Sequence, residues 1–528
     1  MLANHVLTID LGTSGPKVAI FTDRGELVDY ERGHVEVLLF PGGGAEQRPG
    51  DWWKSIKDCI QRLMAKDLVP VDSIVAISCT TQWSGTVPVD KNGEPLSNAI
   101  IWMDSRGAPY IDELMKGPIK IAGYNIFKLF RFLRLSGGVP GFTGKDSLAH
   151  ILYLKGEHPE IYEKAHKLLE PKDYLNARLT GRFAASFDSI TLHWLTDNRK
   201  IENVTYDRRL LKITGIDGDK LPELKRAVDV LGRLRKDIAA DLGLSEKTQV
   251  IVGTPDMHSA AIGSGAVRDY EGHLYVGTSS WLQCYVPFKK VDLLNNMGSL
   301  PSAIPGRYFL ANEQECAGAC LEFLKNNVIY HEDELLADAE LPDVYKLFDR
   351  IVGRVPPGSE GVIFTPWLVG ERTPVDDHHV RGGLHNLSLH NTREHMIRAV
   401  FEGVALNTRW LHRAVEKYIR RPMDNINFIG GGAGSSEWCQ IFADVLGRTI
   451  RQVRDPILAG PRGAAFLALV ALSKMTFDDV AERVQIADTF EPNPANRDLY
   501  DGLFREFKAL YKQNQKINAR LSRAGRRG

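Results

Sequence analysis

Hydrophobic and polar positions at the start of the chain predict three short strands joined by tight turns. Residues His5–Asp10 form a run of β-branched and apolar side chains, which is typical of a buried strand. Turn residues Gly12–Pro16 follow, and then come strand-like runs at Val18–Phe21 and Leu27–Val37. These strands predict an antiparallel meander, whereas a dinucleotide-binding domain would lead from its glycine turn into a helix.

The same pattern recurs about half-way along the chain. His273–Val276 predicts a strand, residues 277–280 predict a turn, and Trp281–Val286 predicts a second strand. The turns at Gly12 and Gly277 lie about half the chain apart. We therefore expect two domains of related design that face each other, although the similarity is too short to establish a duplication.

Between these hairpins the patterns predict mostly helices with a few short strands. Helices are expected over Pro49–Lys66, over much of Asp146–Lys247 and over Glu437–Leu446. Further strands are expected at Ile74–Cys79, Gly85–Val89 and Val250–Gly253.

Length and charge narrow the class of protein. A chain of 528 residues is too long for a single core, so two large domains are expected. Lys+Arg and Asp+Glu are equal at 66 each, which argues against nucleic acid as a partner. The six cysteines form no CxxC pair, so we expect reduced thiols that pack in the interior. Neither a signal peptide nor a membrane-length apolar run is visible, so we expect a cytoplasmic protein without a membrane partner.

The two glycine–hydroxyl turns are candidates for binding phosphate. Glycine lets the backbone approach a phosphate, and turn N–H groups with Thr or Ser hydroxyls bind its oxygens. In the first turn Lys17 can add charge, and Asp10 can hold Mg²⁺ through water. The candidate residues are Gly12, Thr13, Ser14 and Lys17 in the first turn and Gly277, Thr278 and Ser279 in the second. The alternative for each turn is a plain hairpin.

A third glycine-rich segment, Gly430–Ser436, is a candidate for contact with a nucleotide base. It follows a predicted strand and precedes a predicted helix, and its glycines would let a flat ligand lie against the backbone. Ser435 or Ser436 can cap the helix, and the alternative interpretation is a cap with a flexible loop. The GxxxxGK[ST] phosphate loop does not occur in the sequence.

Two further sets of residues are candidates for chemistry and for sugar binding. Asp256 follows the predicted strand at 250–253 and can accept a proton from a substrate hydroxyl, although it can equally be a helix N-cap. A sugar is bound by planar hydrogen-bonding side chains and an aromatic wall. The chain offers such residues at Gln82, Trp83, Ser84, Trp102, Asp104 and Arg106, each of which could alternatively be surface polar or core aromatic.

Taken together, these motifs resemble the FGGY carbohydrate kinases of the actin/hexokinase/Hsp70 superfamily, and most closely the xylulokinases. The resemblance extends from Val6 to Tyr511. It rests on DLGTSGPK (10–17), EQRPGDWW (46–53), PGFTGK (140–145), EPKDYLNARLTG (170–181) with Asp188, PDMHSAAIGSGAV (255–267), GERTP (370–374), the stretch 381–405, GGGAGSSEWCQIFADVLG (430–447) and GPRGAA (460–465).

The resemblance implies an α/β fold of two ribonuclease H-like (actin-like ATPase) domains, residues 1–256 and 257–528, facing across a deep cleft. It implies ATP and Mg²⁺, and transfer of the γ-phosphate to a hydroxyl of a pentulose or a related ketose or polyol. Asp256 would be the catalytic base, and Asp10 and Asp256 would hold the metal. ATP would also contact the third glycine-rich segment, at Gly431, Gly432, Ala433 and Ser436.

Several positions depart from the xylulokinase pattern. Trp83-Ser84-Gly85 stands where Met-His-Gly is typical, and Met257 replaces an Asn after the aspartate. A kinase for another polyol, such as erythritol or glycerol, is therefore an alternative, and a nucleotide-switched interaction protein of the actin/Hsp70 type is an alternative outside the class. Dimers are common in the family, so the resemblance also allows a homodimer.

Overall fold

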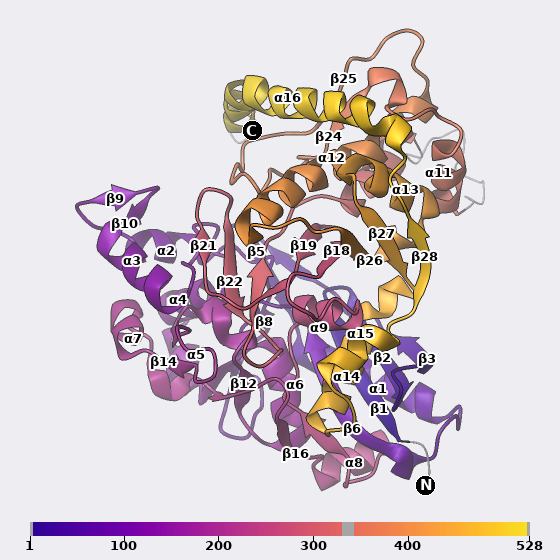
Figure 1. The fold of residues 1–528 in the computed structure, drawn as a ribbon. Helices are drawn as coiled ribbons and strands as arrows, with labels where there is room; N and C mark the ends of the chain where they lie inside the picture. The colour runs from indigo at the N-terminus through magenta and orange to yellow at the C-terminus, as the bar shows by residue number, and fades with distance from the viewer. Residues whose placement is uncertain (1–3, 330–342, 525–528) are drawn as a thin grey trace, which may run out of the picture.

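The computed structural model describes residues 4–329 and 343–524 of the chain. Within this part, two larger sheets organise the molecule, one from each half of the sequence (Figure 1). The first runs in the order β16 (Val230–Arg233), β17 (Gln249–Ile251), β6 (Ile74–Thr81), β1 (His5–Gly12), β2 (Gly15–Thr22), β3 (Leu27–Arg32). The second runs in the order β19 (Ser280–Gln283), β18 (Gly272–Val276), β26 (Asn425–Ile429), β27 (Thr449–Val453), β28 (Ile486–Phe490).

Each sheet is built around the hairpin that the sequence predicts. β1 pairs antiparallel with β2 up to the turn, where Gly12 faces Gly15, and parallel with β6. β18 likewise pairs antiparallel with β19 and parallel with β26. Both predicted strand–turn–strand units are therefore confirmed, and each hairpin joins a parallel neighbour from later in the chain.

Two predicted strands are shorter than their apolar runs. The run at Leu27–Val37 ends as β3 at Arg32, because the backbone then crosses the first turn, where the Val35 N–H donates to the Ser14 carbonyl at 3.1 Å. The run at Trp281–Val286 divides into β19 and β20 (Tyr285–Val286). β20 joins a separate small sheet with β23 (Tyr308–Ala311), β22 (Met297–Pro301) and β21 (Val291–Asp292).

Helices from both halves cover the first sheet. α1 (Pro49–Met64) buries Trp52, Ile56 and Ile60, which recur at helical spacing. A second apolar cluster combines α9 (Asp256–Gly263) and α14 (Ala459–Ala471) with residues of β1 and β6 such as Val6 and Ala76. α14 comes from the end of the chain yet packs against the first strands, so this cluster joins the two halves.

The middle region is less helical than the sequence predicted. Its helices are α4 (Ser147–Glu157), α5 (Pro159–Lys164), α6 (Pro171–Thr180), α7 (Arg208–Thr214) and α8 (Lys236–Leu242). Short strands separate them: β11 (Lys167–Leu169), β12 (Ala184–Ser186), β13 (Thr196–Asp197), β14 (Thr205–Tyr206) and β15 (Glu223–Lys225). The second half carries α10 (Gly318–Leu324), α11 (Val344–Val352), α12 (Arg393–Ile419), α13 (Ser436–Leu446), α15 (Phe477–Arg483) and α16 (Arg497–Ala524).

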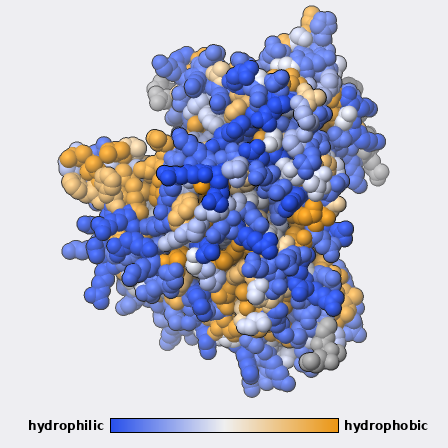
Figure 2. Space-filling model, viewed as in Figure 1, coloured by the Kyte–Doolittle hydropathy of each residue, from blue (hydrophilic) through white to orange (hydrophobic). Residues whose placement is uncertain are grey.

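A small unit projects from the first half and exposes apolar side chains. It consists of β9 (Lys120–Ile121), β10 (Tyr124–Asn125) and α3 (Ile126–Leu135), at the left of Figure 1. Figure 2 shows apolar surface there, and the exposed side chains include Ile121, Phe127 and Phe130. None of the helices over residues 4–329 and 343–524 is both long and apolar enough to cross a membrane.

Candidate functional site

The first glycine–hydroxyl turn brings Asp10 and Lys17 together. Both lie on the β1–β2 hairpin as register partners, and Lys17 Nζ forms an ion pair with the buried Asp10 carboxylate. The N-terminal turn of α14 approaches from the other half of the chain, since a Cβ placed on Gly460 would lie 3.0 Å from Asp10 Oδ2. A helix N-terminus favours negative charge, so both neighbours stabilise the carboxylate.

A chain of hydrogen bonds fixes Thr13 at the tip of this turn. Trp102 Nε1 donates to Thr13 Oγ1 at 2.9 Å, and Thr13 Oγ1 donates to Gln82 Oε1 at 3.1 Å. Gln47 Nε2 donates to the Thr13 carbonyl at 2.7 Å and Gln47 Oε1 accepts from Gln82 Nε2 at 2.7 Å. The structure thus joins three predicted residues, Thr13, Gln82 and Trp102. Gln47, which the sequence reasoning missed, lies within the EQRPGDWW stretch that carried the family resemblance.

The loop after β6 is held by backbone carbonyls from elsewhere in the first half. Trp83 Nε1 donates to the Ser189 carbonyl at 2.9 Å, and the Trp83 ring lies edge-on to His258 with 5.4 Å between centroids. Ser84 adopts a positive φ of 64° and its hydroxyl donates to the Lys145 carbonyl at 2.7 Å. The polar atoms of both side chains are therefore engaged by protein groups.

Asp104 and Arg106 form a compact ion-pair network beside this loop. The buried Asp104 carboxylate accepts from the Ala45 N–H at 2.9 Å and from Arg106 Nε at 2.9 Å. Arg106 also donates to Glu46 Oε1 at 2.6 Å and to the Tyr153 hydroxyl at 3.0 Å. Asp104 and Arg106 thus tie residues 45 and 46 to the loop that follows β8 (Ala99–Ile100), and their polar groups are largely used in doing so.

Asp256 lies at the first position of α9, after the N-cap residue Pro255. Its side chain is half-buried, and Oδ1 accepts from the Met257 N–H at 2.8 Å. Burial, followed by the negative charge of Asp10, raises the pKa of Asp256 to about 7. Asp256 thus begins α9 without being its N-cap, and the same carboxyl has the proton affinity that a general base needs near neutral pH.

The second turn approaches these carboxylates from the other sheet. Burial raises the pKa of the Tyr275 hydroxyl on β18, and the charges of Asp256 and Asp10 add to the effect. Directly after β18, the Gly277 N–H donates to the Ser279 carbonyl at 2.9 Å. The start of α10 fixes the turn, since the Gly318 N–H donates to the Gly277 carbonyl at 2.8 Å.

The third glycine-rich segment packs against the end of β18. Gly430 has a φ of 89°, and a Cβ there would lie 2.5 Å from the Val276 carbonyl oxygen, so only glycine fits. A Cβ on Gly431, in contrast, would meet open space. Ser435, rather than Ser436, caps α13: its hydroxyl accepts from the Trp438 N–H at 3.0 Å and donates to Asp349 at 2.6 Å.

An ion-pair cluster that the sequence reasoning did not assign lies near Asp256. Arg372 Nη2 donates to Glu315 Oε1 at 2.8 Å, and Arg372 also pairs with Glu313. The charge of Glu313 contributes to the raised pKa of Asp256. The GERTP stretch that contains Arg372 was a signal for this cluster, but its partners Glu313 and Glu315 come from a different loop.

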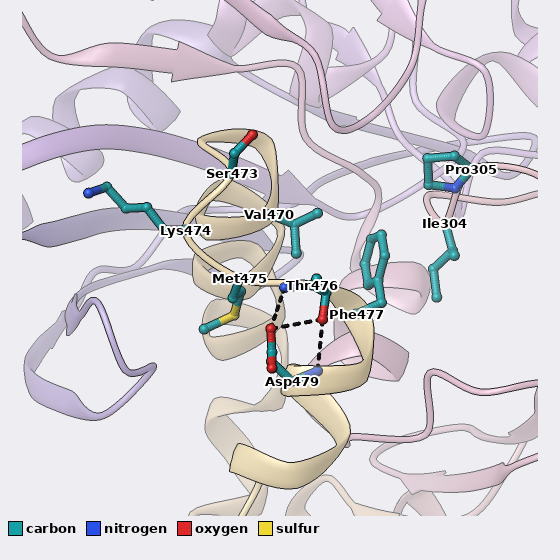
Figure 3. A pocket seen from close by; sticks show the side chains of 9 residues that line it. All are labelled: Ile304, Pro305, Val470, Ser473, Lys474, Met475, Thr476, Phe477 and Asp479. Atoms are coloured by element: carbon teal, nitrogen blue, oxygen red, sulfur yellow. Dashed lines mark hydrogen bonds between the residues drawn. The ribbon is translucent and has the colours of Figure 1, made fainter.

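A separate shallow groove lies at the far end of α14 (Figure 3). Val470 and Phe477 line it together with Ile304 and Pro305. Thr476 and Asp479 also line it and form the capping box at the start of α15. None of the predicted site residues lines this groove, so it is distinct from the region around Asp256.

Two family models together match most of the chain. The N-terminal domain of the FGGY family of carbohydrate kinases matches residues 5–263, and the C-terminal domain of that family matches residues 274–472. The chain belongs to the FGGY family of carbohydrate kinases. Its predicted fold class, two actin-like α/β domains, is thereby confirmed, and it is an ATP-dependent sugar kinase.

Relatives of this FGGY kinase carry more than one activity in their names. The xylulose kinase of Lactococcus lactis is 28% identical over 523 residues, 98% of each chain. The gluconokinase of Bacillus subtilis is 25% identical over 494 residues, 93% of this chain and 92% of its own. The solved gluconate kinase of Lactobacillus acidophilus shares the fold with a TM-score of 0.85 at 24% identity, covering 98% of this chain and 100% of its own.

Proposed function

We propose that this FGGY kinase transfers the γ-phosphoryl group of ATP to a hydroxyl of a pentulose or a related ketose or polyol, with Asp256 as the catalytic base. The observation that carries the proposal is Asp256 itself. It begins a helix beside Asp10 and has a pKa raised to about 7. A carboxyl of this kind accepts a proton at neutral pH more readily than an ordinary aspartate does.

The proposed reaction needs positioning and charge more than covalent chemistry. The oxygen of the acceptor hydroxyl attacks the γ-phosphorus while Asp256 accepts the hydroxyl proton, and ADP leaves. Turn N–H groups and hydroxyls of residues 12–14 and 277–279 hold the phosphates, with Lys17 supplying positive charge. Gly431, Gly432, Ala433 and Ser436 face the adenosine, supported by the exposure of Gly431 and Ser436.

The residues around Asp10 fit a magnesium ion. Asp10 and Asp256 lie close enough for the charge of one to raise the pKa of the other, so a cation between them relieves their repulsion. Mg²⁺ takes few carboxylates and fills its remaining positions with water and phosphate oxygens. When bound, it would neutralise charge that develops on the transferred phosphoryl group.

For the acceptor, the charge near the base favours a neutral sugar over an aldonate such as gluconate. The negative charges of Asp10 and Glu313 act on Asp256, against the positive charge of Lys17, and Arg372 is shared between Glu313 and Glu315. The carboxylate of an aldonate would add a further negative charge and would be repelled. Gln82, Trp83, Ser84 and Trp102 form the acceptor wall in this proposal, and Asp104 with Arg106 supports it.

An ADP-release assay tests this proposal. The panel contains xylulose, ribulose, gluconate, erythritol and glycerol, each with wild-type enzyme and with Asp256→Asn. We expect saturable ADP release with a neutral ketose or polyol, and a loss of about 10²–10⁴-fold in kcat for the variant. A preference for gluconate would refute the neutral acceptor, and full activity of Asp256→Asn would refute the assigned base.

A further inference from the structure

The segment Glu170–Asp173, at the start of α6, lies in the interior and contacts both the loop of Trp83 and the strand that precedes Asp256. We infer that Lys172, Asp173 and Asp188 form a buried positioning network that holds the base and the acceptor wall in register for phosphoryl transfer. The inference rests on the proposed function, because it takes Asp256 as the base and residues 82–85 as part of the acceptor wall.

The burial of this network is nearly complete. Lys172 is 1% exposed, and Asp173 and Asp188 are 0% exposed. Charges in the interior need partners, because they have lost the solvation that water provides. Lys172 Nζ pairs with the neighbouring Asp173 carboxylate. Lys172 thus pairs directly with one of several buried carboxylates, an arrangement that apolar side chains could replace if packing were the sole requirement.

One arm of the network reaches the base. Lys172 Nζ donates to the Val252 carbonyl at 2.9 Å, and Asn176 Nδ2 donates to the same oxygen at 2.7 Å. The Thr254 hydroxyl donates to Asp188 Oδ2. Both anchor points lie within four residues of Asp256, and the chain enters α9 directly after them. The position of the Asp256 carboxyl therefore depends on these bonds.

The other arm reaches the acceptor wall. The Ser189 hydroxyl donates to Asp173 Oδ2 at 3.1 Å, and the Ser189 carbonyl accepts from Trp83 Nε1 at 2.9 Å. The adjacent Glu170 strengthens this arm, since its Oε2 accepts from the Gly85 N–H at 2.9 Å. Two hydrogen bonds thus connect Asp173 to the Trp83 side chain. Glu170, at the start of α6, makes a further hydrogen bond to the same loop at Gly85.

The network is not arranged for stability alone. Among the described residues, Oδ1 of the fully buried Asp188 has no hydrogen-bond partner. A buried acceptor without a donor destabilises the folded state, so an apolar residue of similar shape would serve better there if stability were the sole requirement.

Thr254→Val tests the base arm, because valine matches threonine in shape but lacks the hydroxyl. We expect kcat to fall roughly ten- to a hundredfold, because small displacements of a reacting group have effects of this size, while the KM for ATP stays within about twofold. Thr254→Ser keeps the hydroxyl and restores kcat. The matched control is Thr214→Val on α7, whose buried hydroxyl donates to its own helix at the Leu210 carbonyl. Its kcat stays unchanged.

Ser189→Ala tests the acceptor arm independently. It frees Asp173 from the segment that holds Trp83, so we expect the KM for the sugar to rise about five- to tenfold with a smaller change in kcat. In every variant, a titration with nucleotide measures the concentration of folded enzyme that can bind it, and kcat is calculated from that concentration.

Unchanged kcat in Thr254→Val, or an equal loss in Thr214→Val, overturns the positioning role, as does failure of Thr254→Ser to restore the rate. Identical kcat and KM changes in Thr254→Val and Ser189→Ala would also overturn it, since they indicate general loosening. If the wild-type enzyme phosphorylates no acceptor in the panel, the proposed function itself fails, so the two failures are distinguishable.

Discussion

At the scale of single residues, Asp256 illustrates how the start of a helix can hold a carboxyl whose pKa is raised. A carboxyl in the first turn is ordinarily stabilised as an anion by the helix N-terminus. Here burial and the charge of Asp10 oppose that effect, and the pKa of Asp256 rises to about 7. The carboxyl is then poised between its two protonation states in neutral solution.

This pKa predicts how the reaction rate depends on pH. The protonated carboxyl cannot accept the hydroxyl proton, so kcat/KM for the sugar should fall about tenfold per pH unit below the pKa of Asp256, which is about 7 without Mg²⁺ and is lowered by a cation bound beside it. The measurement is steady-state kinetics from about pH 5 to 9, and the residual rate of Asp256→Asn should lack this limb. A flat wild-type profile would indicate an ordinary aspartate with a pKa near 4.

Gly253, three residues before Asp256, allows a second prediction at the residue scale. Its φ is 73°, and a Cβ there would lie 2.4 Å from the Cys79 carbonyl oxygen. Gly253→Ala should lower the free energy of unfolding by roughly 3 kcal/mol or more, from left-handed strain plus overpacking. Gly243→Ala is the control: it has a φ of 69° but open space, so about 1 kcal/mol is expected. Equal losses in urea denaturation would contradict the steric argument.

At the scale of elements, the pairing of α9 with α14 determines how closely Asp256 and Asp10 approach. Gly263 and Gly463 lie at the crossing, and a Cβ on Gly463 would lie 1.7 Å from the Ser259 carbonyl oxygen. The Ser259 hydroxyl donates to the Gly460 carbonyl at 2.7 Å. Because α9 begins at Asp256 and the start of α14 touches Asp10, the crossing of these helices sets the geometry of the site.

Gly463→Ala should therefore destabilise the protein and impair activity. The methyl group has no room, so we expect the free energy of unfolding to fall by about 1–3 kcal/mol and kcat to decrease as the helices separate. Gly502→Ala on α16 is the matched control, because its nearest neighbour is Arg505 at 3.8 Å. It should raise stability by about 0.5–1 kcal/mol, as alanine favours a helix over glycine. Stabilisation by Gly463→Ala would contradict this argument, because it would show that the contact between α9 and α14 has room for a methyl group.

At the scale of the whole molecule, residues from both halves surround the proposed phosphate site. β1 and β2 come from the first half, while β18, the glycine-rich loop at 430–436 and α14 come from the second. A ligand that contacts both halves binds the folded chain and not the unfolded one, so it stabilises the fold in proportion to its saturation.

Magnesium and a non-hydrolysable ATP analogue should accordingly stabilise the protein together. At a hundred times the dissociation constant we expect about 2.7 kcal/mol, measured by chemical denaturation. Chelation of Mg²⁺ with EDTA should remove most of this gain, and Asp10→Asn should weaken the magnesium-dependent part. Full stabilisation by the analogue in EDTA would contradict the assignment of Asp10 and Asp256 to the metal.

The local hydrophobic pattern predicts the two hairpins and the helix at Pro49. The residues of the motifs, in their order along the chain, indicate the family. These features depend on residues close in sequence, and strand and helix periodicities report them directly. The sequence predicts a mostly helical middle region because its short strands, such as Lys167–Leu169, are too brief to show a strand period.

Tertiary structure alone decided which distant residues meet. Gln47 reaches Thr13, Glu313 reaches Arg372, and α14 crosses from the end of the chain to Asp10. Lys172 and Asp188 likewise reach the segment before Asp256 only through the fold. Such pairings depend on how sheets and helices pack, and a side chain's sequence neighbours carry no record of them. The sequence therefore determined the elements and the chemistry available, and packing decided which side chains share a site.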